Sequence, residues 1–239
     1  MMRALTGDRL LTAWERCAGE HDLNRALTML TLALPTSSRE QLAALPLAER
    51  NVLLLRLHEV SFGPRLRGFA ACSQCGEPLE FALAAGSLAD DLAARRTQGS
   101  GESDTAAAGI ALRPVSTCDL LATLDEPDVA QAQDRLLALG VGAQAADGRT
   151  LRTQPGVLAA FERINAAAEL TCAIACPACA SAESLDLDLA RFLWLEVRHA
   201  ARRLMDEIDA LAGAYGWSER AIVRMSPQRR GAYLEMLNA

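Results

Sequence analysis

Apolar side chains recur every three or four residues through most of this chain, which is the spacing of an amphipathic helix. The pattern predicts two helices within residues 8–34, separated at Gly19, and a further helix over residues 39–61. Two more helical stretches are expected at about 126–139 and 157–170. Alanine and leucine dominate and aromatic residues make up only 4% of the chain, which also favours helices over a β-sandwich.

The longest helical pattern lies near the C-terminus. It runs from about Ala190 to Tyr215, and Gly216 is a suitable residue to end it because glycine readily adopts the left-handed conformation. Ser218 is a candidate cap for a short helix, and Pro227 for the first position of a last one. The C-terminal fifth of the chain is therefore expected to be helical throughout.

Two short segments alternate apolar and other residues with the period of a strand. Leu79, Phe81 and Leu83 form the first, and alternating leucines at 185, 187 and 189 form the second. Between these segments, residues 97–109 have the Gly, Ser and Ala composition of a flexible loop, and residues 140–154 form a Gly-rich connection. Each strand-like segment directly follows a pair of cysteines.

These pairs, Cys72-x-x-Cys75 and Cys176-x-x-Cys179, carry the clearest chemistry in the sequence. Structural zinc takes four ligands in a tetrahedron, and four thiolates are a common set. Two such turns beside strand-like segments are typical of a zinc ribbon, and Gly76 suits the positive φ that follows a knuckle, whereas Ala180 suits it less well. We therefore predict one Zn²⁺ held by all four cysteines. Four protein ligands leave no open position for water, so the site is expected to be structural.

Other readings of the cysteines remain open at this point. The two pairs could be redox-active dithiols, or their spacing could be coincidental. The other three cysteines, Cys17, Cys118 and Cys172, are expected to be buried free thiols. His21, His58 and His199 form no metal-binding pattern and are expected on helix surfaces or at caps. No nucleophile elbow, phosphate-binding loop or dinucleotide fingerprint occurs, so we expect no enzymatic activity.

Charge and hydropathy narrow the classes of partner. All 24 basic residues are arginine, yet the net charge is −6 and the pI is about 5.2, so a bulk attraction to nucleic acid is unfavourable. No apolar run reaches the roughly 18 residues of a membrane span. The N-terminus has Asp8 and no long apolar stretch, which argues against a signal peptide and for synthesis in the cytoplasm.

The sequence thus predicts an α+β fold that is mainly α-helical. Helical N- and C-terminal parts, 1–65 and 190–239, would surround a small four-cysteine β element of the zinc-ribbon type. Its two knuckle hairpins would lie at 66–90 and 168–189. A mostly helical insertion, 91–167, would separate the hairpins, so that one metal ties the first third of the chain to the last.

Several short motifs occur in a fixed order together with the cysteine pairs. They are Trp14-Glu15-Arg16, Phe62-Gly63-Pro64-Arg65-Leu66, both cysteine pairs, Phe192-Leu193-Trp194-Leu195-Glu196-Val197, Tyr215-Gly216-Trp217-Ser218-Glu219, and Ser226-Pro227-Gln228-Arg229-Arg230-Gly231-Ala232-Tyr233-Leu234. With these motifs the chain resembles the small baseplate and hub-assembly proteins of T-even-type contractile phages and of phage-tail-like contractile injection systems. Ala180 and the loop at 97–109 depart from the pattern.

The resemblance implies a non-enzymatic structural or assembly role in a tail baseplate, with other baseplate or hub proteins as partners. The protein would then act in the cytoplasm during assembly or remain in the phage or phage-tail-like particle. Trp, Tyr and Arg are enriched at interface hot spots, so we expect a docking surface formed by Trp217, Arg224, Arg229, Arg230 and Tyr233. A solvated helix face is the simpler reading of these arginines. A zinc-ribbon nucleic-acid-binding or regulatory protein and a thiol oxidoreductase are the rival classes.

Overall fold

Four helices form the N-terminal part of the chain, and two of them begin with a side-chain cap. The computed structural model describes residues 1–98, 106–107, 110–141 and 147–237. The side chain of His21 accepts a hydrogen bond from the backbone of Leu23, and Ser38 forms a capping box with Gln41, so each of these two helix starts has a partner for part of its free N–H groups. The helices here are α1 (Asp8–Cys17), α2 (Asp22–Ala33), α3 (Arg39–Ala43) and α4 (Leu47–Phe62).

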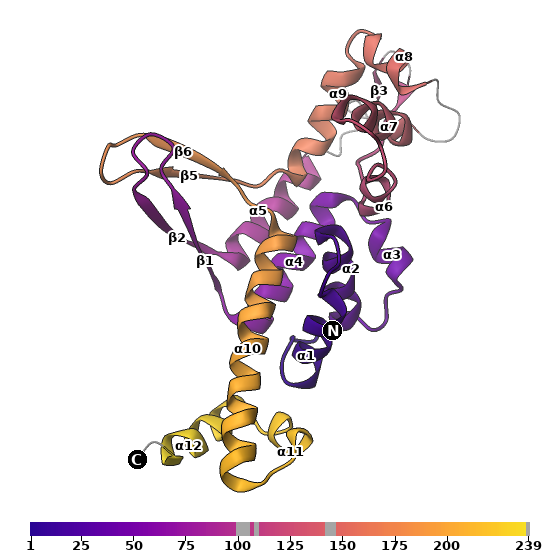
Figure 1. Ribbon diagram of the computed structural model, residues 1–239. Coiled ribbons are helices and arrows are strands. Elements are labelled where there is room, and N and C mark those ends of the chain that lie inside the picture. The colour runs from indigo at the N-terminus through magenta and orange to yellow at the C-terminus, as the bar shows by residue number, and fades with distance from the viewer. Residues whose placement is uncertain (99–105, 108–109, 142–146, 238–239) are drawn as a thin grey trace.

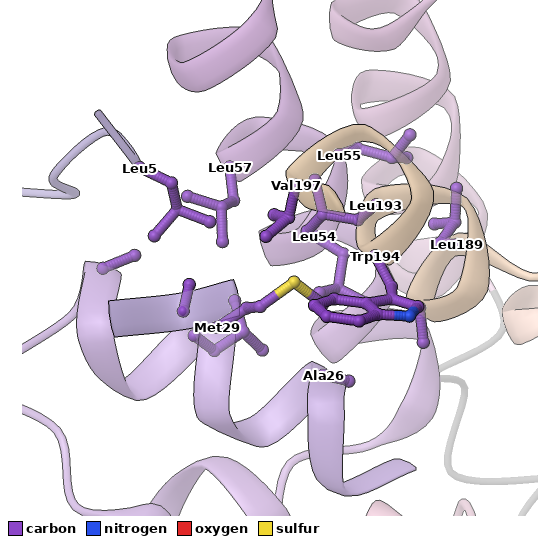
Figure 2. Packing of buried hydrophobic residues seen from close by; sticks show 14 of the residues in the cluster. Leu5, Ala26, Met29, Leu54, Leu55, Leu57, Leu189, Leu193, Trp194 and Val197 are labelled. Carbon is purple, nitrogen blue, oxygen red and sulfur yellow. The ribbon is translucent and has the colours of Figure 1, made fainter. Parts of the chain in front are cut away.

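The long helix α10 (Leu189–Tyr215) provides the surface on which these helices assemble (Figure 1). One stripe of α10, which includes Leu193 and Val197, is buried against leucines of α4 and residues of α2 (Figure 2). The indole of Trp194 lies beside Met29 in the same cluster, and the Arg25 guanidinium sits 4.9 Å from its ring centroid. Each fully buried leucine contributes about 1.5–3 kcal/mol, so this cluster is the main source of stability.

Two β-hairpins project from the helices as an arm, and their tips approach one another (Figure 1). Strands β1 (Arg65–Ala71) and β2 (Pro78–Ala84) form the first hairpin, and β5 (Thr171–Ala175) and β6 (Ala182–Asp186) form the second. Both pairs are antiparallel, with Ala71 opposite Pro78 and Ala175 opposite Ala182 next to the turns. In the first hairpin, the Phe81 ring covers Gly68, where a Cβ atom would come within 2.3 Å of the ring.

The segment between the hairpins is mostly helical, as predicted, but its details differ. Helix α5 packs along α4 directly after the first hairpin, so that hairpin ends at Ala84. A helix, α8, lies within the predicted connection at 140–154. The predicted flexible loop at 97–109 falls largely outside the described residues. The elements are α5 (Ala85–Gln98), β3 (Ala106–Ala107), β4 (Ile110–Ala111), α6 (Thr117–Leu121), α7 (Val129–Val141), α8 (Gly148–Thr153), α9 (Val157–Asn165) and a 3₁₀ turn (Ala166–Ala168).

This insertion has a small apolar core of its own. Leu137, Leu151 and Val157 are buried together, from α7, α8 and α9 respectively. The cluster is separate from the main helical core, and Figure 1 shows these helices as a distinct lobe above α4. The polar connection between lobe and core includes a hydrogen bond from Asn51 Nδ2 to the carbonyl of Ala168.

The C-terminal helices follow the sequence expectation closely. Gly216 ends α10 with a φ of 66°, and Ser218 caps α11 (Glu219–Val223) through the N–H of Ala221. The last helix, α12 (Pro227–Leu237), begins at the predicted proline. Within the described residues, no helix has the length and apolar character needed to span a bilayer.

The fold is therefore α+β and mainly helical, as predicted. Among the expectations for single residues, those for His58 and Cys118 were wrong. His58 was expected on a surface or at a cap but is 2% exposed, packed between the rings of Phe62 and Phe192. Cys118 was expected to be buried but is exposed, because Thr117 and Asp119 occupy the inward face of the short helix α6.

Candidate metal centre

The two cysteine turns have the same local structure, which the backbone fixes before any metal is considered. In the first turn, the N–H of Gly76 donates to the carbonyl of Cys72 at 2.9 Å. In the second, the N–H of Ala180 donates to the carbonyl of Cys176, also at 2.9 Å. Both turns therefore fold back sharply enough to bring two thiols of one pair to the same side.

Positive φ after each knuckle accompanies this turn. Gly76 has a φ of 75° and Ala180 a φ of 58°. Ala180 is the one residue other than glycine with positive φ in the described part of the chain. The second knuckle thus has the same backbone geometry as the first, although Ala180 has a side chain and Gly76 has none. The Cβ atom of Ala180 makes this left-handed backbone conformation strained.

The four sulfur atoms converge at the tips of the hairpins. Cys72 Sγ lies 3.6 Å from Cys179 Sγ, and Cys75 Sγ lies 3.7 Å from Cys176 Sγ. All four lie within 4.8 Å of one another, and none forms a disulfide. Zinc–sulfur bonds of about 2.3 Å in a tetrahedron place sulfurs about 3.8 Å apart. The cluster therefore has the size of a four-thiolate metal site.

One thiol in each pair is buried and the other is exposed. Cys72 and Cys176 are buried with Leu79, and Ala70 and Ile174 pack against them. Cys75 and Cys179 face solvent. The hydroxyl and backbone N–H of Ser181 lower the pKa of Cys179 to about 6. The site thus combines an apolar inner side with an open outer side, where hydrogen bonds from Ser181 favour the thiolate of Cys179.

A carboxylate that sequence reasoning missed joins the two hairpins beside the sulfurs. Glu183 on β6 accepts hydrogen bonds from the backbone N–H and the hydroxyl of Ser73, at 3.1 and 3.0 Å. The same oxygen is 3.3 Å from Cys72 Sγ and from the Ser181 hydroxyl. Because Ser73 and Glu183 are 110 residues apart in sequence, no local pattern could have paired them.

Cys17, Cys172 and Asp188 do not belong to this cluster. Cys172 and Cys17 are buried free thiols, as predicted, and burial raises the pKa of Cys17 to about 11. Asp188 caps α10 by accepting from the N–H groups of Ala190 and Arg191. These residues therefore have structural explanations.

The aromatic residues proposed for partner binding pack mainly on each other. Trp217 stacks on Tyr215 with ring centroids 4.5 Å apart, and Tyr233 meets the Trp217 ring edge-on at 4.9 Å. The Arg229 guanidinium lies 5.8 Å from the Tyr233 ring centroid. This cluster fastens α12 to the end of α10, far from the cysteines (Figure 1).

Arg224 and Arg230 have contrasting positions in the same region. Arg230 is 5% exposed, donates to Glu207 at 2.6 Å and donates to the carbonyl of Met225 at 2.7 Å. Its side chain is therefore occupied within the chain and is not offered to a partner. Arg224 and Arg229 are exposed.

Comparisons with known proteins identify no relative of this chain. No protein-family model matches the chain, and neither a curated protein nor a solved structure matches it.

Proposed function

We propose that this chain is a non-enzymatic structural or assembly component of a contractile-tail baseplate, with a structural Zn²⁺ at the tips of its β-hairpin arm. The convergence of four sulfurs from two turns 100 residues apart in sequence is the observation that carries the metal assignment. Four thiolates in a tetrahedron suit Zn²⁺ or an iron–sulfur centre, and zinc is the ion most often held this way for structural purposes.

The baseplate assignment rests on the ordered set of motifs. Two of these motifs lie at joints between parts of the structure: Phe62 to Leu66 lead from α4 into the arm, and Tyr215 to Glu219 lead from α10 into the C-terminal helices. Residues at such joints determine the relative position of surfaces, which is the requirement of an adaptor.

Metal content is tested by native mass spectrometry of the full chain, before and after treatment with a strong chelator. The proposal expects one zinc per chain, and loss of zinc in a variant with Cys72→Ser and Cys176→Ser. Cys118→Ser is the matched control because Cys118 is exposed and lies outside the cluster. A chain that binds no metal and instead cycles reversibly between dithiol and disulfide would favour the oxidoreductase class.

The baseplate role is tested in the organism that encodes the chain. Deleting its coding sequence should leave tail sheaths and tubes without complete baseplates in negative-stain electron micrographs. Normal particles in the deletion strain would contradict the proposal. Salt-sensitive binding of the purified chain to DNA or RNA would favour the zinc-ribbon nucleic-acid-binding class instead.

The proposed docking surface at the C-terminal helices consists of the exposed Arg224 and Arg229 together with the half-buried rings of Trp217 and Tyr233. Replacing Arg224 and Arg229 with Glu should prevent incorporation into particles while zinc content is unchanged. Charge reversal at exposed Arg149 in the insertion is the matched control. Incorporation of the Arg224→Glu, Arg229→Glu double variant at the normal level would contradict the docking proposal.

A further inference from the structure

A cavity of about 860 Å³ lies where α4 and the start of α10 meet the insertion lobe. Its apolar lining includes Leu47, Val115, Phe161 and Leu170, and its polar lining includes Arg50 and Asn51. The volume falls in the range of about 300–1,000 Å³ that is typical of small-molecule sites. The cysteine cluster contributes no residue to this cavity.

Arg50 is the feature of this cavity that needs an explanation. It is 9% exposed, and its hydrogen bonds go to neutral oxygens only. Nε and Nη2 donate to Asn51 Oδ1, at 3.2 and 2.8 Å, and Nη1 donates to Thr117 Oγ1 at 3.3 Å. No carboxylate of the described residues forms an ion pair with it.

A buried guanidinium without a carboxylate partner is costly, because charge is removed from water and not compensated. Burial lowers the pKa of Arg50, and the charge of Asp188 opposes that change. Asp188 already accepts from the first N–H groups of α10 and is not within ion-pair distance of Arg50. The guanidinium is therefore held in place by neutral groups while its charge is left for another partner.

The pattern of donors indicates the shape of that partner. Each Nη atom carries two N–H groups, and only one on each has a partner among the described residues. Asn51 Oδ1 occupies the Nε/Nη2 edge of the guanidinium, so a carboxylate would pair with the Nη1/Nη2 edge, in the two-donor geometry that arginine favours.

Carboxylates at the rim of the cavity restrict the charge that the rest of the ligand can carry. Exposed Glu169, Asp186 and Asp188 lie among its lining residues, as does Asp22, which pairs with Arg25 at 2.6 Å. These carboxylates oppose negative charge in the cavity generally, so an anionic group is favoured only in direct contact with Arg50. Phosphate esters and nucleotides, which carry further negative charge, are therefore disfavoured relative to a monocarboxylate.

We propose that this cavity binds a small organic monocarboxylate, with its carboxylate on Arg50 and its apolar body against Val115, Phe161 and Leu170. The site is independent of the metal centre and of the baseplate role, and each can fail without the other.

The test is saturation-transfer NMR on the full-length chain with three probes that share one ring. Benzoate carries one negative charge, benzamide is its neutral counterpart, and terephthalate adds a second carboxylate. Benzoate should bind in the millimolar range, and benzamide about tenfold more weakly, as expected when a charge-assisted pair of hydrogen bonds is lost. Terephthalate should also bind more weakly than benzoate because of the rim carboxylates.

Variants then assign the effect to Arg50. Arg50→Gln should abolish benzoate binding, and Arg191→Gln, at an exposed arginine outside the cavity lining, should preserve it. Arg50→Lys keeps the charge without the planar fork and should bind benzoate weakly, which provides a second readout if Arg50→Gln does not fold. Absence of benzoate binding, equal binding of benzoate and benzamide, or unchanged benzoate binding in a folded Arg50→Gln would each overturn the proposal.

Discussion

At the residue scale, Ala180 shows that the second cysteine turn keeps its conformation even with a Cβ atom at the position where that conformation favours glycine. It occupies the left-handed region in the second knuckle, where Gly76 stands in the first. The left-handed conformation costs an L-residue about 1–2 kcal/mol, whereas glycine adopts it freely. That the turn keeps its hydrogen bonds despite this cost indicates that its neighbours determine its conformation.

Replacing Ala180 with Gly should therefore stabilise the protein. We expect a gain of about 0.5–1 kcal/mol in the free energy of unfolding, because relief of strain exceeds the added flexibility of glycine in the unfolded chain. Chemical denaturation monitored by circular dichroism would measure it. Gly76→Ala is the mirror-image control and should lose a similar amount, and a destabilised Ala180→Gly would contradict the strain argument.

His58 is expected to make the free energy of unfolding depend on pH. Burial lowers its pKa below the ordinary value of 6.5, and its Nδ1 atom has no partner among the described residues. Since the unfolded chain takes up a proton at higher pH than the folded one, stability is complete above about pH 6.5 and falls as the pH drops below it. The loss should not exceed about 1.4 kcal/mol per pH unit for this one proton.

Unfolding of the wild type and of His58→Leu should be compared at pH 7.5 and 5.5. The variant should lose less stability between the two conditions than the wild type does. Exposed His199 supplies the control, since His199→Leu should retain the full pH dependence. Parallel losses in the wild type and in His58→Leu would exclude His58 as the cause.

At the scale of elements, the arm consists of two hairpins that share little apolar contact. The buried cluster at their tips contains Cys72, Leu79 and Cys176. Two-stranded hairpins are at best marginally stable alone in water. The sulfur cluster and the hydrogen bonds of Glu183 are therefore what hold the hairpins together.

Glu183→Gln should weaken metal binding by about tenfold, because groups that orient metal ligands typically influence affinity by 10–100-fold. The neutral amide would keep an oxygen acceptor for Ser73 but lose the charge assistance. Competition with a chromophoric chelator would measure the affinity. Glu80 is an exposed carboxylate on β2, and Glu80→Gln is the control that should leave the affinity unchanged. Equal metal affinities for Glu183→Gln and the wild type would show that Glu183 has no role in the site.

At the scale of the whole molecule, the helical core and the arm are separate sources of stability. The main core contains residues from α1 to α5 and α10, with Leu66 at the base of β1, and none of the four clustered cysteines. Metal removal should therefore affect the arm and spare the core.

Hydrogen–deuterium exchange with and without chelator should show this separation. Backbone amides of 65–84 and 171–186 should exchange faster after chelation, whereas the amides of α4 and the middle of α10 should keep their protection. Exchange of Cys72→Ser should resemble that of the chelated wild type. Loss of protection in α10 on chelation would mean that the metal stabilises the whole fold.

Much of this architecture could be predicted because it depends on local spacing. Gly216 ends α10, Ser218 caps the start of α11, and Pro227 begins α12. Each of these boundaries, like each knuckle turn, follows from a few consecutive residues. The burial of His58 and Arg230 could not be predicted, because it depends on Phe192 and Glu207, which are distant in sequence. The Ser73–Glu183 bond and the cavity at Arg50 are likewise products of tertiary packing.

The separation of the two cysteine turns along the chain also sets an order of events during synthesis. One hundred residues separate Cys75 from Cys176, which at about 5–20 residues per second is roughly 5–20 seconds of translation. Throughout that interval the first turn has emerged without its counterpart, while α1, α2 and α4 have only part of their core. The arm can close only after the ribosome has made most of the chain. With the proposed Zn²⁺ as the tie between the two turns, a cell short of zinc at that moment would accumulate molecules with a formed helical body and an open arm. The supply of metal would then limit how many complete copies are made.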